Sequence, residues 1–331
     1  MHGVVANSRV VSTSERYRRF AQAEAHGESD RYEEWALGVA GDLQLLDLLD
    51  GLPSDKRQPN LLFAAARYVG VASNDFAEFR TALLARWPTV RRTMLEKRTQ
   101  SNEPGRCAVL LPVLASLPQP LALLEVGASA GLCLYPDKFS YQYGDHPRLD
   151  PAAGPGAAVL HCEISGTVPL PTQLPEIAWR GGIDLNPLDV WNREDMRWLE
   201  TLIWPEQQHR RERLTAAIDV ARHEPARIVA GDLNQTIEQL AGEAPTDATL
   251  VIFHSAVLAY LDHQERTNFV TKMTTIDGHW ISNESPAVVP MPRIVEMRPS
   301  PAPGRALFVV ARDGQALAYS GPHGQSLHWI G

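Results

Sequence analysis

Apolar side chains recur with helical spacing through the first hundred residues of the chain. Tyr32, Trp35, Ala36 and Val39, for example, stand at positions i, i+3, i+4 and i+7, which places them on one face of a helix. No alternation of polar and apolar residues interrupts this region. The sequence therefore predicts a helical N-terminal region over residues 1–118, which we expect to act as a lid or as a dimerisation element.

From about Leu121 the pattern changes to short, strand-like apolar runs. These runs are 121–126, 177–184, 227–231, 249–254, 280–283, 306–312 and 327–330. Helical segments separate most of them, which predicts right-handed crossovers and a parallel sheet. The last two runs are joined by a connection that contains Gly and Pro and has no helical pattern. We expect these two to pair as a closing antiparallel hairpin.

These elements together predict an α/β protein with a Rossmann-like domain over residues 119–331. Five wound strands followed by a two-stranded hairpin make up the seven-strand sheet of a class I methyltransferase. Residues 141–176 are rich in Pro and Gly, and we expect them to form a small β insertion.

The segment with the most chemical information is EVGASAG, residues 125–131, after the first predicted strand. A strand that breaks at glycine before a helix brings backbone N–H groups and the positive helix end to one place. The turn then suits a nucleotide-type cofactor, held by Glu125 and by Gly127, Ala128, Ser129 and Gly131. The same residues match the G-x-S-x-G pattern of a nucleophilic serine at Ser129. A tight turn that binds nothing is a third interpretation.

A second acid follows the next predicted strand, in the run GIDLNP of residues 182–187. An acid at this point of an open α/β sheet accepts hydrogen bonds from a ribose, so Asp184 and Leu185 are candidate cofactor-binding residues. Asp145 lies nearer the usual distance from the glycine turn and is the competing candidate. We favour Asp184 because its flanks are those of a buried strand. Helix capping is its alternative role.

Later strand ends supply further cofactor-binding candidates. Asp232 follows the third wound strand and is placed to receive the amino group of an adenine, with Leu233 packing on the ring. Helix capping is again the alternative for Asp232. His254 and Ser255 end the fourth wound strand, whose tip faces the ligand crevice of a doubly wound sheet.

Three residues are candidates for catalysis. His254 lies at the end of its strand, Tyr260 follows shortly after it, and Glu284 ends the next strand after Asn283. His254 or Glu284 is expected to take a proton from an acceptor hydroxyl or amine. A lone histidine is as often a buried structural residue, which is the alternative for His254.

Several short segments, taken in order, resemble the bacterial family called domain of unknown function 2332. They are Gln100-Ser101-Asn102-Glu103, the glycine turn, the run GIDLNP, Trp204-Pro205-Glu206, and His254-Ser255 with Tyr260-Leu261. That family resembles divergent S-adenosylmethionine-dependent methyltransferases, so the resemblance implies this cofactor and no particular substrate. We expect residues 98–106 either to fold over the mouth of the crevice or to form a plain linker.

The sequence therefore favours a methyltransferase that uses S-adenosylmethionine on a small molecule. Methyl transfer depends on alignment and desolvation, and a carboxylate acceptor needs no base. One alternative is a methyltransferase-shaped protein that binds a ligand or partner without catalysis. The other is a serine hydrolase that uses Ser129, although a helical region precedes the turn where a hydrolase has several strands.

Composition narrows the classes of function. A formal charge of −8 argues against a nucleic-acid coat or a basic membrane-surface protein. The three cysteines are far apart and lack metal-type spacing, so we expect no disulfide framework, no metal site and a cytoplasmic location. There is no signal-peptide pattern, and Pro112, Pro118 and Pro120 interrupt the apolar stretch 107–124. We therefore expect no membrane span.

Overall fold

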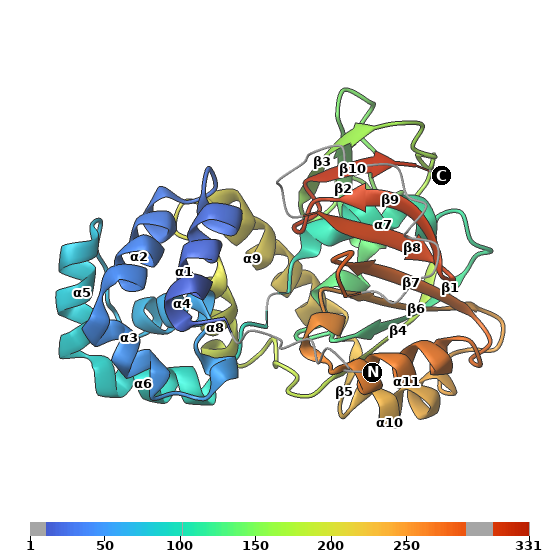
Figure 1. Ribbon diagram of the computed structural model, residues 1–331. Coiled ribbons are helices and arrows are strands. Elements are labelled where there is room, and N and C mark those ends of the chain that lie inside the picture. The colour runs from blue at the N-terminus through green and yellow to red at the C-terminus, as the bar shows by residue number, and fades with distance from the viewer. Residues whose placement is uncertain (1–10, 101, 289–306, 331) are drawn as a thin grey trace, which may run out of the picture. The chain divides into compact units, whose positions relative to one another are not determined.

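The computed structural model of the chain describes residues 11–100, 102–288 and 307–330 (Figure 1). The chain divides into two compact units, the first made of 1–100 and 197–208 and the second of 101–196 and 209–331. The sequence placed a boundary near residue 118. The second unit begins earlier because the buried apolar helix α7 (Cys107–Leu114) packs against strands of the sheet.

Helices make up every described element between residues 11 and 100, in line with the apolar spacing. They are α1 (Thr13–Phe20), the π-helical turn η1 (Ala21–Ala25), α2 (Asp30–Gly41), α3 (Leu43–Asp50), the 3-10 turn η2 (Ser54–Lys56), α4 (Pro59–Tyr68), α5 (Phe76–Ala85) and α6 (Trp87–Glu96). Ser12, Ser29, Asp42 and Asp75 cap four of these helices through side-chain oxygens that accept a backbone N–H.

Aromatic side chains fill the core of the first unit. Trp35 stacks on Phe79 with 3.9 Å between ring centroids. Trp198 and Trp204 belong to the same core although they lie a hundred residues further along the chain. Trp204 Nε1 donates to Asn60 Oδ1 at 2.9 Å. The segment 197–208 is therefore part of the first unit, which the sequence pattern did not indicate.

A mostly parallel ten-stranded sheet forms the second unit, so the protein is a mixed α/β protein. The strands are β1 (Leu121–Val126), β2 (Ser140–Tyr143), β3 (Val159–Ser165), β4 (Ile177–Asp184), β5 (Arg227–Ala230), β6 (Thr249–Ser255), β7 (His279–Glu284), β8 (Phe308–Arg312), β9 (Gln315–Ser320) and β10 (Ser326–Trp329). Their order is β2-β3-β10-β9-β8-β7-β6-β1-β4-β5 (Figure 1).

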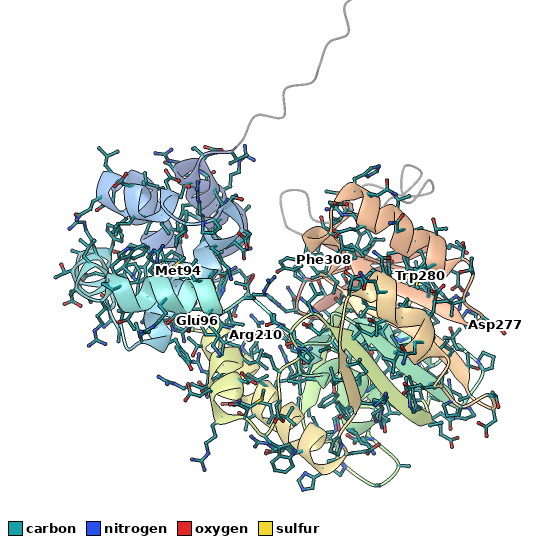
Figure 2. The ribbon with its side chains drawn as sticks, turned by 90° about the horizontal axis from the view of Figure 1, so that it is seen from below. Met94, Glu96, Arg210, Asp277, Trp280 and Phe308 are labelled. Carbon is teal, nitrogen blue, oxygen red and sulfur yellow. The ribbon has the colours of Figure 1, made fainter. Side chains whose placement is uncertain are left out.

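The half of the sheet from β5 to β7 is parallel, as the sequence predicted. All four neighbouring pairs in the order β5-β4-β1-β6-β7 are parallel. The helices in the connections are α8 (Arg193–Leu202), α9 (Gln208–His223), α10 (Leu233–Ala241) and α11 (His263–Met273). Side chains of α10 and α11 share a core with Trp280 of β7, which is labelled in Figure 2.

The other half of the sheet differs from the expected seven-strand layout. The runs 306–312 and 327–330 are not partners, because β9 lies between β8 and β10 and pairs antiparallel with both. Asp313 and Gly314 have φ angles of 51° and 80°, the left-handed conformation that a two-residue hairpin requires. This turn makes β8 and β9 the hairpin, and the predicted pairing was wrong. Residue 306 lies outside the described residues.

The connection from β1 to β4 also differs from a wound crossover, since its described part has no α-helix. Two 3-10 turns, η4 (Leu132–Leu134) and η5 (Pro136–Lys138), follow β1. The chain then forms β2 and β3, which join the sheet at its far edge through β10. The expected β insertion within 141–176 is therefore an extension of the main sheet.

Candidate functional site

The carboxyl end of β1 lies at the point where the strand order reverses. Glu125 pairs in register with Gly182 of β4 on one side and Phe253 of β6 on the other. Open α/β sheets bind their ligands outside the carboxyl ends of the strands at such a switch point. The candidate site therefore lies at the carboxyl end of β1, between β4 and β6.

The glycine turn after β1 has a tightly constrained backbone. Gly127, Ser129 and Gly131 have φ angles of 70°, 51° and 71°, which favour glycine at the first and third positions. A Cβ on Gly127 would lie 2.4 Å from Val257 Cγ2. Gly182 lacks a side chain for a related reason, because a Cβ on it would lie 2.6 Å from the Cβ of Ala128. The turn is packed against loops of both neighbouring strands.

Most backbone N–H groups of the turn already have acceptors. Gly127 and Ala128 both donate to Ile183 O, at 2.8 and 3.0 Å, and Gly131 donates to Ala128 O at 2.6 Å. Only a three-residue 3-10 turn follows. The expected helix end with free backbone donors is therefore absent from the described turn, and side chains are left to provide the ligand contacts.

Asp184 is the acid that reaches the glycine turn. Its Oδ2 accepts the backbone N–H of Ser129 at 2.8 Å, and its Oδ1 accepts that of Asn186 at 2.8 Å. The competing candidate, Asp145, follows β2, which six strands separate from β1 in the sheet order. Leu185, next to Asp184, is 67% exposed, although it is a large apolar residue. The structure thus brings Asp184 and Leu185 to the turn.

Glu125 is buried, and its Oε2 has no hydrogen-bond partner among the described residues. Burial raises the pKa of Glu125 well above its ordinary value, and the neighbouring Cys133 and Asp184 raise it further. Arg106 opposes this shift only in part. A buried polar atom without a partner is costly, so this oxygen is the strongest sign of a ligand at the end of β1.

Asp232 and Leu233 have structural roles in the described fold. Asp232 is the N-cap of α10, where its Oδ1 accepts the N–H of Asn234 at 2.9 Å. Leu233 is buried in the core beneath α10 together with Ile237. The capping interpretation accounts for Asp232, and the adenine contact expected of this pair stays a prediction.

His254 and Glu284 form a buried pair with each other. His254 Nδ1 lies 2.8 Å from Glu284 Oε1, and Trp280 Nε1 donates to His254 Nε2 at 2.9 Å. Because Trp280 is only a donor, Nε2 is the acceptor and Nδ1 carries the proton. Both ring nitrogens are therefore engaged, as the structural alternative for His254 expected.

Glu284 also holds the loop after β6. Its Oε1 accepts the N–H groups of Val257 and Leu258 at 2.7 and 3.1 Å. Ser255 accepts a hydrogen bond from Asn283 Nδ2 at 2.8 Å. Tyr260 is 67% exposed on the following turn, η6 (Leu258–Tyr260). Of the catalytic candidates, Tyr260 alone has a largely exposed side chain.

Ser129 does not have the surroundings of a nucleophile. It is 2% exposed, and its Oγ has no hydrogen-bond partner within the described part of the chain. A serine nucleophile needs a base in hydrogen-bond reach. His254 is committed to Glu284 and Trp280.

The sequence analysis missed a buried ionic cluster beside this site. Glu103 accepts from Arg210 Nε at 2.5 Å and from Arg213 Nε at 2.8 Å. Both arginines come from α9, whose Arg210 is labelled in Figure 2. Burial alone would raise the pKa of Glu103, but the charges of Arg210 and Arg213 outweigh it and lower the pKa to about 2. In the sequence, the segment QSNE at residues 100–103 was the feature that pointed to Glu103.

The residues around Glu103 tie the segment before α7 to the rest of the sheet. Asn102 Oδ1 accepts the N–H of Leu132 at 2.7 Å, directly after the glycine turn. Gly105 approaches the turn between β9 and β10 so closely that a Cβ on it would lie 2.5 Å from His323 O. Asn102 and Glu103 are therefore built into the fold and do not form a plain linker.

Comparison with known protein families identifies the family of this chain. A family model described as an uncharacterized protein conserved in bacteria, DUF2332, matches residues 14–329. The chain belongs to this family. No curated protein matches it. Among the described helices, none is both long and apolar enough to cross a membrane. The described His, Cys, Asp and Glu side chains form no group that could hold a metal ion.

Proposed function

We propose that this DUF2332 protein binds S-adenosylmethionine at the carboxyl ends of β1 and β4 and methylates a small molecule. One observation carries the proposal. The Asp184 carboxylate is bonded to the glycine turn, and beside it the buried Glu125 has an oxygen without a partner among the described residues. Acids at these two strand ends, on either side of a tight glycine turn, suit the polar groups of an adenosine ligand.

The donor set fits this cofactor. A carboxylate offers about four lone-pair positions, and each oxygen of Asp184 accepts a backbone N–H, from Ser129 and from Asn186. These bonds hold the carboxylate at the glycine turn, where an acid of an open α/β sheet accepts from a ribose hydroxyl. Leu185 offers an exposed apolar surface beside this carboxylate for a base. When bound, S-adenosylmethionine supplies a methyl group on a positively charged sulfur.

The engaged state of His254 bears on the acceptor. Because both nitrogens of His254 are used within the fold, this histidine is poorly placed to take a proton from a substrate. Glu284 Oε1 is likewise used by His254 and by two backbone N–H groups, while its Oε2 is buried without a partner among the described residues. We therefore propose an acceptor that needs no base, such as a carboxylate. The same observation favours the second candidate, a protein that binds the cofactor without methyl transfer. Turnover with small carboxylic acids separates the two.

Calorimetric titration with S-adenosylmethionine and its demethylated product tests the proposal. Leu185→Ala is the cleanest variant, because an exposed side chain contributes little to folding. We expect it to weaken binding about fivefold to tenfold, the loss of roughly 1 kcal/mol of apolar contact. Leu43→Ala, which removes an 83% exposed leucine from α3, is the matched control and should leave binding unchanged.

A second titration examines the acids themselves. Glu125→Gln keeps the shape of the side chain and should weaken binding about fivefold to tenfold, the effect of one hydrogen bond worth roughly 1 kcal/mol. Asp232→Ala alters an acid at the end of β5 and should have a smaller effect. Absence of binding by the unaltered protein, or an affinity in both the Leu185 and the Glu125 variant equal to that of the unaltered protein, would contradict the site.

A further inference from the structure

Arg106 is a buried cation whose hydrogen bonds go to carbonyl groups. It ends the 3-10 turn η3 (Pro104–Arg106) and is 6% exposed. Nε donates to Pro322 O at 3.0 Å and Nη1 donates to Ser255 O at 3.1 Å. No described carboxylate forms an ion pair with it, and no described acceptor reaches Nη2. A buried charge without an ionic partner is unusual.

The neighbouring charges do not compensate Arg106. Arg210 and Arg213 share one carboxylate, that of Glu103. Three buried or nearly buried guanidinium groups therefore face Glu103 and, further off, Glu125. The raised pKa of Glu125 favours its uncharged form, so Glu125 offsets little of the charge of Arg106.

Two unpartnered polar atoms lie close to the same arginine. They are Glu125 Oε2 and His323 Nδ1, which are buried and have no hydrogen-bond partner among the described residues. His323 directly follows Pro322, whose carbonyl accepts from Arg106 Nε, and the charge of Arg106 lowers the pKa of both side chains. Arg210 Nη1 lies 3.4 Å from His323 Nε2, and because arginine only donates, the proton of a neutral His323 is on Nδ1. This places an unused donor beside Arg106.

His323 adds no charge of its own near neutral pH. Burial lowers the pKa of His323, and the charges of Arg210 and Arg106 lower it further, to about 3. The titratable and charged groups around Arg106 are thus His323, Cys133, Glu103, Glu125, Arg210 and Arg213. None of these groups forms an ion pair with Arg106, since Glu103 pairs with Arg210 and Arg213.

We propose that Arg106 binds the carboxylate of a small acid, between the end of β6 and the turn that joins β9 to β10. The open edge of one guanidinium, with its single charge, matches a monoanion better than a phosphate dianion. His323 Nδ1 supplies a second donor. This site requires no cofactor, and together with the proposed function it would hold an acidic methyl acceptor.

Thermal unfolding in sodium acetate, with sodium chloride at matched ionic strength, tests the site directly. A ligand that binds the folded state raises the midpoint in proportion to its occupancy. We expect acetate to stabilise the unaltered protein more than chloride does. Arg106→Gln should weaken acetate binding at least tenfold, since a charge-assisted hydrogen bond is lost. Arg106→Lys, which keeps the charge, should weaken it less.

Arg227→Gln is the matched control. It removes an arginine that pairs with Glu243 on the exposed start of β5, so it changes net charge equally and should keep the acetate effect. An equal acetate shift in the unaltered protein and Arg106→Gln would overturn the proposal. A larger shift with inorganic phosphate than with acetate would overturn the assignment to a carboxylate.

Crystals of the unaltered protein provide a measurement that does not depend on any variant. Bromide exchanged for acetate should give an anomalous peak beside Arg106, and its absence would overturn the proposal even if the Arg106 variants fail to fold. Titration with S-adenosylmethionine stands apart from both measurements. Acetate binding without cofactor binding would refute only the proposed function, and the reverse result would refute only the carboxylate site.

Discussion

Glu103 and Glu125 are both buried in the same unit, yet the two regions around them differ in what surrounds the carboxyl group. Glu103 lies between two arginines, which lower its pKa to about 2. Glu125 has no ion pair among the described residues, and its burial raises its pKa well above the ordinary value. Burial acts in the same direction on both acids, so the neighbouring charges decide the difference. Glu103 holds two arginines of the fold in place. Glu125 Oε2 has no hydrogen-bond partner among the described residues, and it is here that we propose a ligand.

The largest expected effect is the loss of Glu103. Glu103→Ala leaves Arg210 and Arg213 without their shared carboxylate in a buried place. Removal of one member of a buried ionic group costs about 3–5 kcal/mol, which urea unfolding would measure. Glu243→Ala, which breaks an exposed pair with Arg227, should cost less than about 1 kcal/mol. Equal losses in the two variants would remove the contrast.

Acid should unfold the protein through the same group. The pKa of Glu103 is about 2 in the folded state against 4.5 as its ordinary value, so the folded state holds its proton less readily. The stability from this ionisation is present above pH 4.5 and is lost as the pH falls from 4.5 toward 2. The loss is on the order of 3 kcal/mol. Comparison of unfolding curves with those of Glu103→Gln would reveal it as a difference that vanishes in acid.

Glu125 should show the opposite dependence on pH. Because its pKa is raised in the folded state, its contribution to stability is full below 4.5 and is lost as the pH rises toward the folded value. Glu125→Gln cannot ionise, so it should become progressively more stable relative to the unaltered protein as the pH rises from 4.5. The gain is expected to be smaller than the loss in Glu103→Ala. A variant that is less stable at every pH would show that Glu125 is instead structural.

The smallest effect is expected at a third acid, Asp232. Asp232 lies neither in the arginine cluster of Glu103 nor in the buried surroundings of Glu125, and it caps α10. Asp232→Ala should cost about 1 kcal/mol, the usual effect of a lost N-cap, with little dependence on the ligand. A loss of cofactor affinity as large as that of Glu125→Gln would return Asp232 to the binding site.

The wound half of the sheet could be predicted from sequence because its strands are short, apolar and bounded by glycine or acids. The bounds of β1 and β4 matched the apolar runs of residues 121–126 and 177–184. β9 could not be recognised because its sequence, QALAYS, has no β-branched residue. The tight Asp313-Gly314 turn, which creates the hairpin, was assigned to a longer connection.

The candidate site was only partly predictable for a related reason. Glu125 lies near the end of β1 and Asp184 ends β4, so the local sequence pattern was enough to indicate both. The partners of Glu103 lie 107 and 110 residues away in α9, and no local pattern connects them. His254 has the sequence setting of a catalytic residue, but Trp280, 26 positions further on, occupies its second nitrogen. Long-range pairing decides such cases, and one sequence does not reveal it.

The position of β10 has a consequence for how the chain is made. β2 and β3 are close in sequence and pair with each other, but β3 joins the rest of the sheet through β10, beginning with the pair of Glu163 and Ser326. On the ribosome, this pair must wait for the whole intervening chain before its open edge is covered. Unpaired strand edges recruit other strands, and distant pairings form slowly. Translation therefore exposes this protein to mispairing for longer than its compact sheet suggests, and helper proteins that shield nascent edges should raise its yield.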